Sequence, residues 1–138
     1  MKDIMRSWIE HLVLNSLDQP GYPKQTCLVM DNEARTFAPL DGATTLLENL
    51  LIHYWQGLSM PLRFFPRSSL AYATKGTLDA ARKEWRDDTF NNRPGEGSDP
   101  AILCCFGSSE PFDEEFCSLA VELLGAMIEA VGEKAQSV

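Results

Sequence analysis

The sequence predicts an α/β domain of the α+β kind, in which a small mixed sheet is flanked by helices. Two long stretches, 44–59 and 113–131, repeat apolar residues at helical spacing. Two short β-prone runs, Gln25–Met30 and Arg35–Leu40, are separated by a short polar connection. A third run, Ala101–Phe106, is apolar on both faces, which is typical of a buried strand.

The first helix is expected over Asp3–Leu17, because its apolar residues recur at every third or fourth position. These residues are Ile4, Met5, Trp8, Ile9, Leu12 and Val13. Two prolines and a glycine within Asp18–Pro23 then break the helix. Asp31–Ala34 is short and polar enough to join the first two strands as a hairpin. Pro39 cannot donate to a strand ladder, so the second strand ends there or lies at an edge.

The helix over Thr44–Ser59 has apolar residues around much of its circumference, so we expect it to be buried on more than one side. These residues are Leu46, Leu47, Leu50, Leu51, Tyr54, Trp55 and Leu58. The segment Pro61–Ala73 is irregular at first and then extended or helical. Another helix is expected after Gly76, with Thr77 as its N-cap. Its core-facing residues are Leu78, Ala81 and Trp85.

A long loop is expected over Asn91–Pro100, which is rich in turn residues. The last helix is expected over Asp113–Val131, with one broad apolar face. That face holds Phe116, Leu119, Ala120, Leu123, Leu124, Met127, Ile128 and Val131. The acidic residues at 113–115 suit the positive end of this helix. Residues 134–138 are expected to fray.

Length and composition fit a single domain over residues 1–138. No apolar run approaches the length of a membrane helix, so no membrane contact is expected. The N-terminal residues do not resemble a signal peptide, which predicts a cytoplasmic protein. The four cysteines, Cys27, Cys104, Cys105 and Cys117, form no C-x-x-C pair. We expect them to be buried, reduced thiols, and we expect no metal site and no cofactor.

The net charge of −8 is unevenly distributed along the chain. Residues 61–95 hold seven Lys and Arg against four Asp and Glu, whereas residues 96–138 hold one against nine. Phosphate groups repel an acidic surface, so the C-terminal helix is expected to face away from DNA. Only the middle third has a charge that suits phosphate, and an ordinary mixed, solvated surface is the favoured interpretation of that charge.

The sequence lacks the common motifs of nucleotide hydrolysis, serine catalysis and magnesium-dependent nuclease activity. There is no phosphate-binding P-loop and no nucleophile elbow, and neither histidine is placed in sequence to activate Ser68 or Ser69. A magnesium-dependent nuclease of the PD-(D/E)xK type needs an acid at the end of one strand and an acid-x-lysine triplet on the next. Asp31 supplies the first acid, but the run Arg35–Leu40 contains neither an acid nor a lysine. Glu33-x-Arg35 lies in the turn. We therefore expect no catalytic residue.

The most distinctive segment is Tyr54–Ala71, in which a helix leads into a proline-anchored aromatic pair. We expect Phe64 and Phe65 to fill the core, with Arg63 and Arg67 beside them. These arginines are placed to meet a partner's carboxylate or a phosphate group. The candidate DNA- or partner-binding residues are Arg63, Phe64, Phe65, Arg67, Ser68 and Arg93.

Several short motifs, taken in order, resemble the C-terminal part of the exodeoxyribonuclease V gamma chain, the RecC family. They are W-x-x-H-L at Trp8–Leu12, Phe37-Ala38-Pro39, Tyr54-x-x-Gly57, Pro61-Leu62-x-Phe64-Phe65-Pro66-Arg67-Ser68, Trp85, Arg93-Pro94-Gly95-Glu96, Asp99-Pro100 and Pro111–Phe116. The order and spacing of these motifs together carry the resemblance. The resemblance covers nearly all of this chain and only the last part of a longer family member.

The resemblance implies a degenerate PD-(D/E)xK restriction-endonuclease-like fold whose active site has been lost. It implies a non-catalytic scaffold or DNA-path domain in DNA end processing for double-strand break repair by recombination. The expected partners are the beta and alpha subunits, RecB and RecD, with DNA contacted through the whole complex. Two alternatives stay open: a small active magnesium-dependent DNA nuclease, and a protein-interaction module unrelated to DNA.

Overall fold

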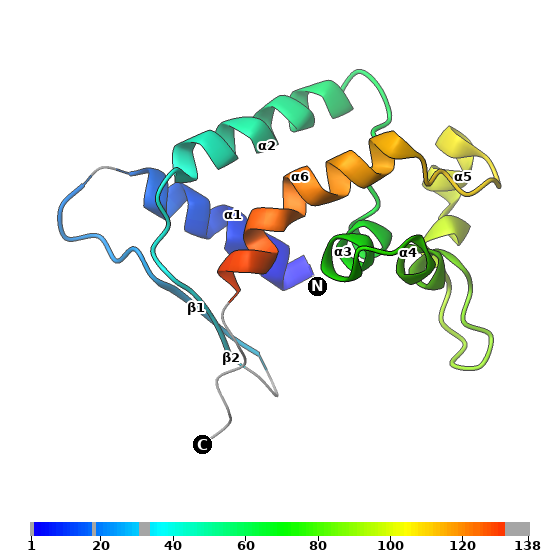
Figure 1. Cartoon of the computed structure of the whole chain (residues 1–138), viewed down its shortest axis with the longest axis horizontal. Coiled ribbons are helices and arrows are strands. Elements are labelled where there is room, and N and C mark those ends of the chain that lie inside the picture. Colours follow the sequence, from blue (N-terminus) through cyan, green and yellow to red (C-terminus); the bar gives the residue numbers. More distant parts are fainter. Residues whose placement is uncertain (1, 18, 31–33, 132–138) are drawn as a thin grey trace. The chain divides into compact units, whose positions relative to one another are not determined.

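The computed structural model describes residues 2–17, 19–30 and 34–131, and it has the α+β fold that the sequence predicts (Figure 1). Its elements are α1 (Lys2–Ser16), β1 (Thr26–Val29), β2 (Ala34–Phe37), α2 (Ala43–Gly57), α3 (Pro66–Lys75), α4 (Leu78–Trp85), the 3-10 helix η1 (Glu96–Ser98), α5 (Pro100–Phe106) and α6 (Glu114–Ala130). They fall into two compact units. Unit 1 comprises Met1–Gln56 and Glu129–Val138, and unit 2 comprises Gly57–Ile128.

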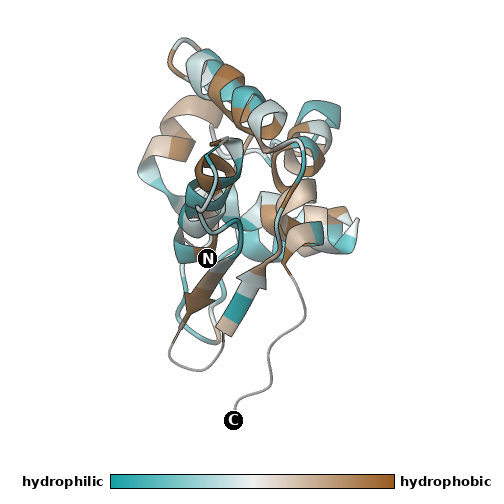
Figure 2. Ribbon diagram, turned by 90° about the vertical axis from the view of Figure 1, so that its left-hand side faces the viewer, coloured by the Kyte–Doolittle hydropathy of each residue, from teal (hydrophilic) through white to brown (hydrophobic). Residues whose placement is uncertain are grey.

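The sheet of unit 1 is an antiparallel hairpin in which Thr26 of β1 lies opposite Phe37 of β2. Figure 2 shows the hydrophobic colour along most of β1. Phe37 also forms an antiparallel bridge with Val131, just after α6. The pairing confirms the predicted hairpin. The connection predicted at residues 31–33, including Asp31, lies outside the described residues, as do residues 134–138.

The core of unit 1 is built on the inner face of α1. Trp8, His11 and Leu12 are buried there, at the i, i+3 and i+4 spacing of one helix face. Their partner is the buried Phe37 at the end of β2, whose ring centroid lies 5.6 Å from Trp8 and 5.4 Å from His11. The imidazole of His11 also makes a 2.9 Å hydrogen bond with Thr26 Oγ1, so its polar edge has a partner.

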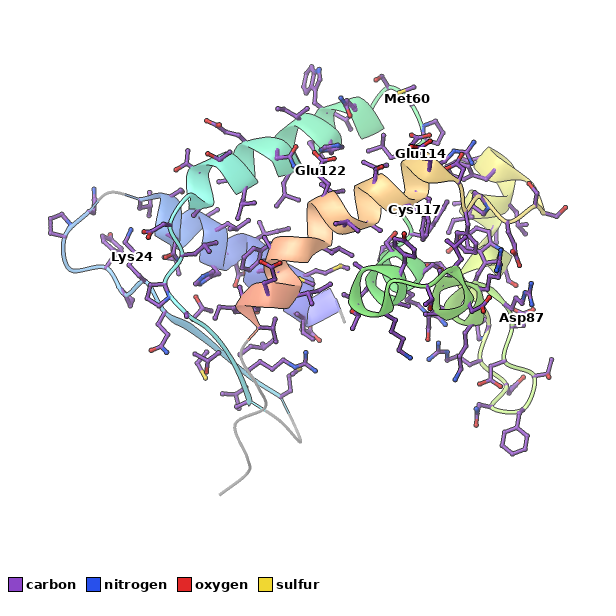
Figure 3. The ribbon with its side chains drawn as sticks, in the orientation of Figure 1. Lys24, Met60, Asp87, Glu114, Cys117 and Glu122 are labelled. Atoms are coloured by element: carbon purple, nitrogen blue, oxygen red, sulfur yellow. The ribbon has the colours of Figure 1, made fainter. Side chains whose placement is uncertain are left out.

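Two polar side chains fix the C-terminal end of α1. Asn15 Nδ2 donates to the carbonyl of Lys24 at 3.0 Å, while its Oδ1 accepts from the amide of Leu40 at 3.1 Å. The ammonium group of Lys24 (labelled in Figure 3) donates to the carbonyls of Leu14, Asn15 and Leu17. These carbonyls have no acceptor role inside the helix, and a cation is favourable at this negative end.

An aromatic cluster forms the core of unit 2. Phe65, Ala81, Trp85 and Phe116 are buried at its centre, and Tyr72, Leu78, Ile102, Phe106, Phe112 and Cys117 pack around them. The Phe65 ring makes edge contacts with Trp85 at 4.9 Å and Phe106 at 5.2 Å between centroids. This confirms the predicted core-facing side of α4 and the predicted burial of Phe65, whereas Phe64 is half-buried.

The strand predicted at Ala101–Phe106 was wrong, because this segment forms the helix α5. Asp99 caps the helix, accepting from the amide of Ala101 at 2.8 Å, and Pro100 occupies its first turn. Such an Asp-Pro start is a helix signal that outweighs the apolar run. Only Ile102 and Phe106, four residues apart, pack on the aromatic cluster. The sheet within the described residues therefore has two strands.

The expected burial of α2 on more than one side was also wrong. Leu46, Leu50 and His53 are half-buried along one row, and Ala43 is buried. The remaining surface of the helix includes Leu51, Ile52, Tyr54 and Trp55, which are 57%, 55%, 66% and 74% exposed. We call these four side chains the α2 apolar face.

The cysteines are also more exposed than predicted. Cys27, Cys104 and Cys105 are exposed, and only Cys117 is partly buried. Cys104 and Cys105 were expected inside a buried strand, but α5 is a short helix that turns both side chains outward. Their thiols therefore contribute little to the packing of unit 2.

The buried His11 predicts a pH-dependent stability. Burial lowers the pKa of His11 below its ordinary value of 6.5, with a smaller opposing effect from a hydrogen bond to the Ala38 backbone. Because the folded chain binds the proton less readily than the unfolded chain, this contribution is complete above about pH 6.5. It is lost as the pH falls from there through the folded pKa. Urea unfolding between about pH 7.5 and about pH 5.5 measures the effect.

The control is His11→Gln, which has no titrating group at this position. The free energy of unfolding of the variant should fall less steeply over the same pH range than that of the original chain. Parallel pH dependences in the two proteins would contradict the assignment.

Candidate functional site

The candidate residues around Arg67 and Arg93 come together in unit 2, although they lie far apart in sequence. The segment Pro66–Ser68 begins α3, and the loop Arg93–Glu96 lies against that helix start. A hollow of about 530 Å³ opens between them. Its walls are Pro66, Arg67, Pro94, Gly95, Glu96, Ser98, Asp99, Pro100 and Ile102.

Glu96 is the central side chain of this arrangement. Its carboxylate accepts from the backbone amide of Arg67 at 2.9 Å and from that of Ser68 at 2.8 Å. These amides have no acceptor within α3, and the end of the helix they belong to is positive. Glu96 is only 9% exposed. A carboxylate from a distant loop therefore caps α3, and the helix start that would otherwise attract an anion is already occupied.

A second contact completes the cap. The backbone amide of Phe65, just before α3, donates to Ser69 Oγ at 3.0 Å. Three amides at this helix start thus have side-chain acceptors, two from Glu96 and one from Ser69. The hydroxyl of Ser68 is fully buried, so it is not accessible to a substrate as a nucleophile.

The guanidinium groups of Arg67 and Arg93 share one carboxylate. Arg67 Nε lies 3.2 Å from Glu84 Oε2, and Arg93 pairs with the same oxygen. Arg67 also donates from Nη1 to the carbonyl of Pro94 at 3.0 Å. Glu84 is one-quarter exposed, so this group is only partly screened by water. The two arginines tie α3, α4 and the loop together before any partner binds.

Two glycines let the loop approach α4 closely. A Cβ on Gly97 would lie 2.4 Å from the Trp85 ring, and one on Gly95 would lie 2.1 Å from the Trp85 carbonyl oxygen. Neither distance is compatible with a side chain. The backbone of the loop lies directly on Trp85, and this packing requires glycine at both positions.

Arg63 lies in a separate ion-pair group. Its Nε is 3.2 Å from Asp113 Oδ2 and from Glu115 Oε2, and its guanidinium carbon lies 5.9 Å from the centre of the Phe106 ring. Asp113 also accepts from the amide of Phe116 at the start of α6. Asp113 and Glu115 therefore lie at the start of α6, as predicted, and also pair with Arg63. This arginine was predicted from the sequence as a DNA- or partner-binding residue.

Sequence reasoning missed the acids that hold these arginines. Glu84 and Glu96 were not selected, and neither was Glu110, which pairs with Arg82 at 3.0 Å and with Arg86 at 2.6 Å. These contacts span from 9 residues, for Arg93 with Glu84, to 29 residues, for Arg67 with Glu96. Only the repeated arginine–acid composition of residues 79–110 signalled them.

Unit 1 has a hollow of its own, of about 460 Å³, between α1 and the end of β1. It is lined by Asp3, Arg6, Ser7, Glu10, Leu28, Val29 and Met30. Arg6 Nε and Glu10 Oε1 form an exposed ion pair at 3.1 Å. The hollow contains two carboxylates, Asp3 and Glu10, and one of them already has a cationic partner.

Two features of the described residues bear on the kind of site this chain can hold. Within residues 2–17, 19–30 and 34–131, no three His, Cys, Asp or Glu side chains are grouped as metal ligands. In the same part of the chain, no helix has both the length and the apolar character needed to cross a membrane.

The cap predicts that Glu96 stabilises unit 2 strongly for a single surface-loop residue. Glu96→Ala leaves two amides without their acceptor and should reduce the free energy of unfolding by about 2 kcal/mol. Glu96→Gln keeps one acceptor oxygen and should cost about half as much. Chemical denaturation measures both changes. The matched control is Glu48→Gln on exposed α2, which should change stability by less than about 0.5 kcal/mol; equal effects at both sites would contradict the cap.

Comparison with known proteins supports the family resemblance over the first part of the chain. The family model described as "RecC C-terminal domain" matches residues 1–77, from α1 through α3 to just past its end. Neither the curated proteins nor the solved structures gave a match. The matched region covers more than half of the chain and includes the start of α3, whereas the capping Glu96 lies beyond it. The chain belongs to the RecC C-terminal domain family.

Proposed function

We propose that this chain is a non-catalytic scaffold domain of the exodeoxyribonuclease V gamma subunit, acting in DNA end processing for recombinational repair. The observation that carries the proposal is the family match over residues 1–77. Membership in the RecC C-terminal domain family implies a place in the RecBCD complex of DNA repair. The scaffold role rests on what the side chains of each unit are used for.

The carboxylates of unit 2 serve as structural partners. Glu96 caps α3, Glu84 and Glu110 each bind two arginines, and Asp113 with Glu115 binds Arg63. A magnesium centre needs several carboxylates directed at one point with free oxygen lone pairs. Redirecting Glu96 to a metal would release the cap of α3, and redirecting Glu84 or Glu110 would take a carboxylate partner from two arginines. This usage supports a scaffold.

The arginines selected from the sequence are engaged in the same way. Arg63, Arg67 and Arg93 all have carboxylate partners within unit 2. A DNA phosphate would have to compete with those carboxylates for the guanidinium groups. We therefore propose that this unit contributes to the DNA path through the shape and stability it gives the complex, with DNA held by the whole assembly.

The surface that suits assembly is the α2 apolar face of unit 1. Leu51, Tyr54 and Trp55 follow the i, i+3, i+4 spacing by which one helix docks on another protein. Each is more than half exposed. A single aromatic side chain can bury roughly 150–250 Å², so two adjacent aromatics and two aliphatic residues form a patch of the size that marks interaction sites.

We assign this face to a sister subunit of the RecBCD complex. It lies within the matched residues 1–77, and its helix carries one charged residue, Glu48. A nearly uncharged face offers no attraction to phosphate and is best covered by apolar protein surface. The beta and alpha subunits, RecB and RecD, are therefore the proposed partners.

The degenerate PD-(D/E)xK arrangement stays a prediction. In unit 1, the carboxylates of Asp3 and Glu10 line the hollow beside β1. The competing nuclease function would have to be assembled in that hollow. A direct test of metal binding and cleavage separates the two readings.

Replacing the α2 apolar face should abolish assembly while preserving the helix. The variant Leu51→Glu with Trp55→Lys introduces an i, i+4 acid–base pair, which supports an isolated helix. Because it removes the central apolar contacts, RecB and RecD should no longer co-purify with the chain. Quantitative co-purification of all three subunits provides the measurement.

The matched control is Ile9→Glu with Val13→Lys on α1, a second exposed apolar pair at the same spacing in unit 1. This variant should assemble like the original chain. Normal assembly of the α2 variant would refute the docking role. If both variants lost RecB and RecD equally, the loss of assembly would reflect general destabilisation of unit 1.

A magnesium titration tests the non-catalytic assignment. The isolated chain should show no saturable magnesium binding by calorimetry and should leave linear duplex DNA intact. The variant Asp3→Asn with Glu10→Gln should behave identically. Specific binding together with cleavage, both lost in that variant, would establish the nuclease function instead.

A further inference from the structure

The turn between Asp88 and Arg93 presents an exposed aromatic ring. The two residues pair as an antiparallel bridge, with the amide of Asp88 donating to the Arg93 carbonyl at 2.9 Å and the reverse bond at 3.0 Å. The Asp88 carboxylate accepts from the amide and side chain of Asn91 at 3.1 and 2.7 Å. Asn92 adopts the left-handed conformation, with a φ of 49°, that tight turns often use. We call Asp88–Arg93 the Phe90 turn.

The base of the turn is braced on both sides. Asp87 (labelled in Figure 3) accepts from the Gly95 amide at 2.7 Å and from Ser98 Oγ at 2.5 Å. Arg93 at the other side is bound to Glu84 of α4. The chain on either side of the turn therefore has several independent attachments to unit 2, and the turn projects from a fixed base.

The ring of Phe90 is 94% exposed at the tip. Its exposed fraction exceeds those of Val29 and Trp55, at 76% and 74%. A single exposed apolar residue is ordinary on a protein surface. What distinguishes Phe90 is its position on a braced turn, because a backbone that is already fixed loses less conformational freedom when the ring docks. Aromatic anchors of this kind dominate protein interfaces.

The charges around the ring favour a protein pocket over nucleic acid. Hydrogen bonds from Ser98 and Gly95 lower the pKa of Asp87, and hydrogen bonds from Asn91 lower that of Asp88. The carboxylates of Asp87 and Asp88 are therefore ionised at neutral pH, and they lie three and two residues before Phe90. Arg86 and Arg93 balance these charges, so Arg86–Arg93 has no net charge. A neutral turn with two adjacent carboxylates gives a phosphate backbone no net attraction.

We propose that the Phe90 turn inserts its ring into an apolar socket on a sister subunit of the RecBCD complex. This inference rests on the proposed function, which supplies the assembly, and it names a second contact, in unit 2. The socket has apolar walls for the ring and a polar rim that accommodates both the carboxylates and the guanidinium groups at the base of the turn.

The experiment measures binding of the immobilised chain to purified RecB and RecD. Phe90→Ala should weaken binding at least tenfold, as expected for an anchor residue. Phe90→Tyr, which keeps the ring, should bind within about threefold of the original chain. The matched control is Thr89→Ala in the same turn, also exposed, which should leave affinity unchanged.

Each other outcome overturns a defined part of the proposal. If Phe90→Ala binds normally while the α2 variant does not, the socket is wrong and the scaffold function stands. If neither variant affects binding, both proposals fail. A parallel titration with fluorescent oligothymidylate tests base stacking: loss of oligonucleotide binding in Phe90→Ala, with subunit binding intact, would assign the ring to nucleic acid and overturn the protein socket.

Discussion

The contact on which unit 2 most depends is the capping of α3 by Glu96. Its carboxylate joins two amides at the helix start to a loop that lies 28 residues further along the chain. Buried charge is costly unless it is fully paired, and this helix start supplies both hydrogen bonds and a positive dipole. The same loop is held against Trp85 through glycines that admit no side chain. The contact of Glu96 with α3 holds the backbone of Arg67 in place. The neighbouring Gly95 amide binds Asp87 at the base of the Phe90 turn.

This arrangement supports the proposed scaffold role of unit 2. A helix start with free amides is a natural anion site, but here the anion is part of the chain. The arginines that resemble a phosphate-binding set are neutralised in the same internal way, by Glu84 and by the acids at the start of α6. Among the exposed apolar side chains, the α2 apolar face in unit 1 and the ring of Phe90 in unit 2 are the ones that we propose for partners. Together these observations favour protein contacts over chemistry.

The sequence predicted the elements whose signals are local. The periodic apolar residues of α1, α2 and α6 and the β1–β2 hairpin were anticipated, because each depends on spacing within a few residues. Ala101–Phe106 was misread, since an apolar run of that length fits a strand or a helix, and Asp99-Pro100 decided for the helix. Burial of α2 was overestimated because a pattern shows which side is apolar but not whether a partner covers it. The roles of Glu84 and Glu96 depend on contacts across many residues, which one sequence does not display.

The most direct test of this account is amide hydrogen exchange at the start of α3. If Glu96 holds the two amides, those of Arg67 and Ser68 should exchange slowly in the original chain, near the rate set by unfolding of unit 2. Glu96→Gln should accelerate exchange at these amides, and at the Gly95 amide that Asp87 binds, while the hairpin amides of unit 1 keep their rates. Unchanged protection of Arg67 and Ser68 in the variant would show that the helix start does not depend on this carboxylate and would contradict the account.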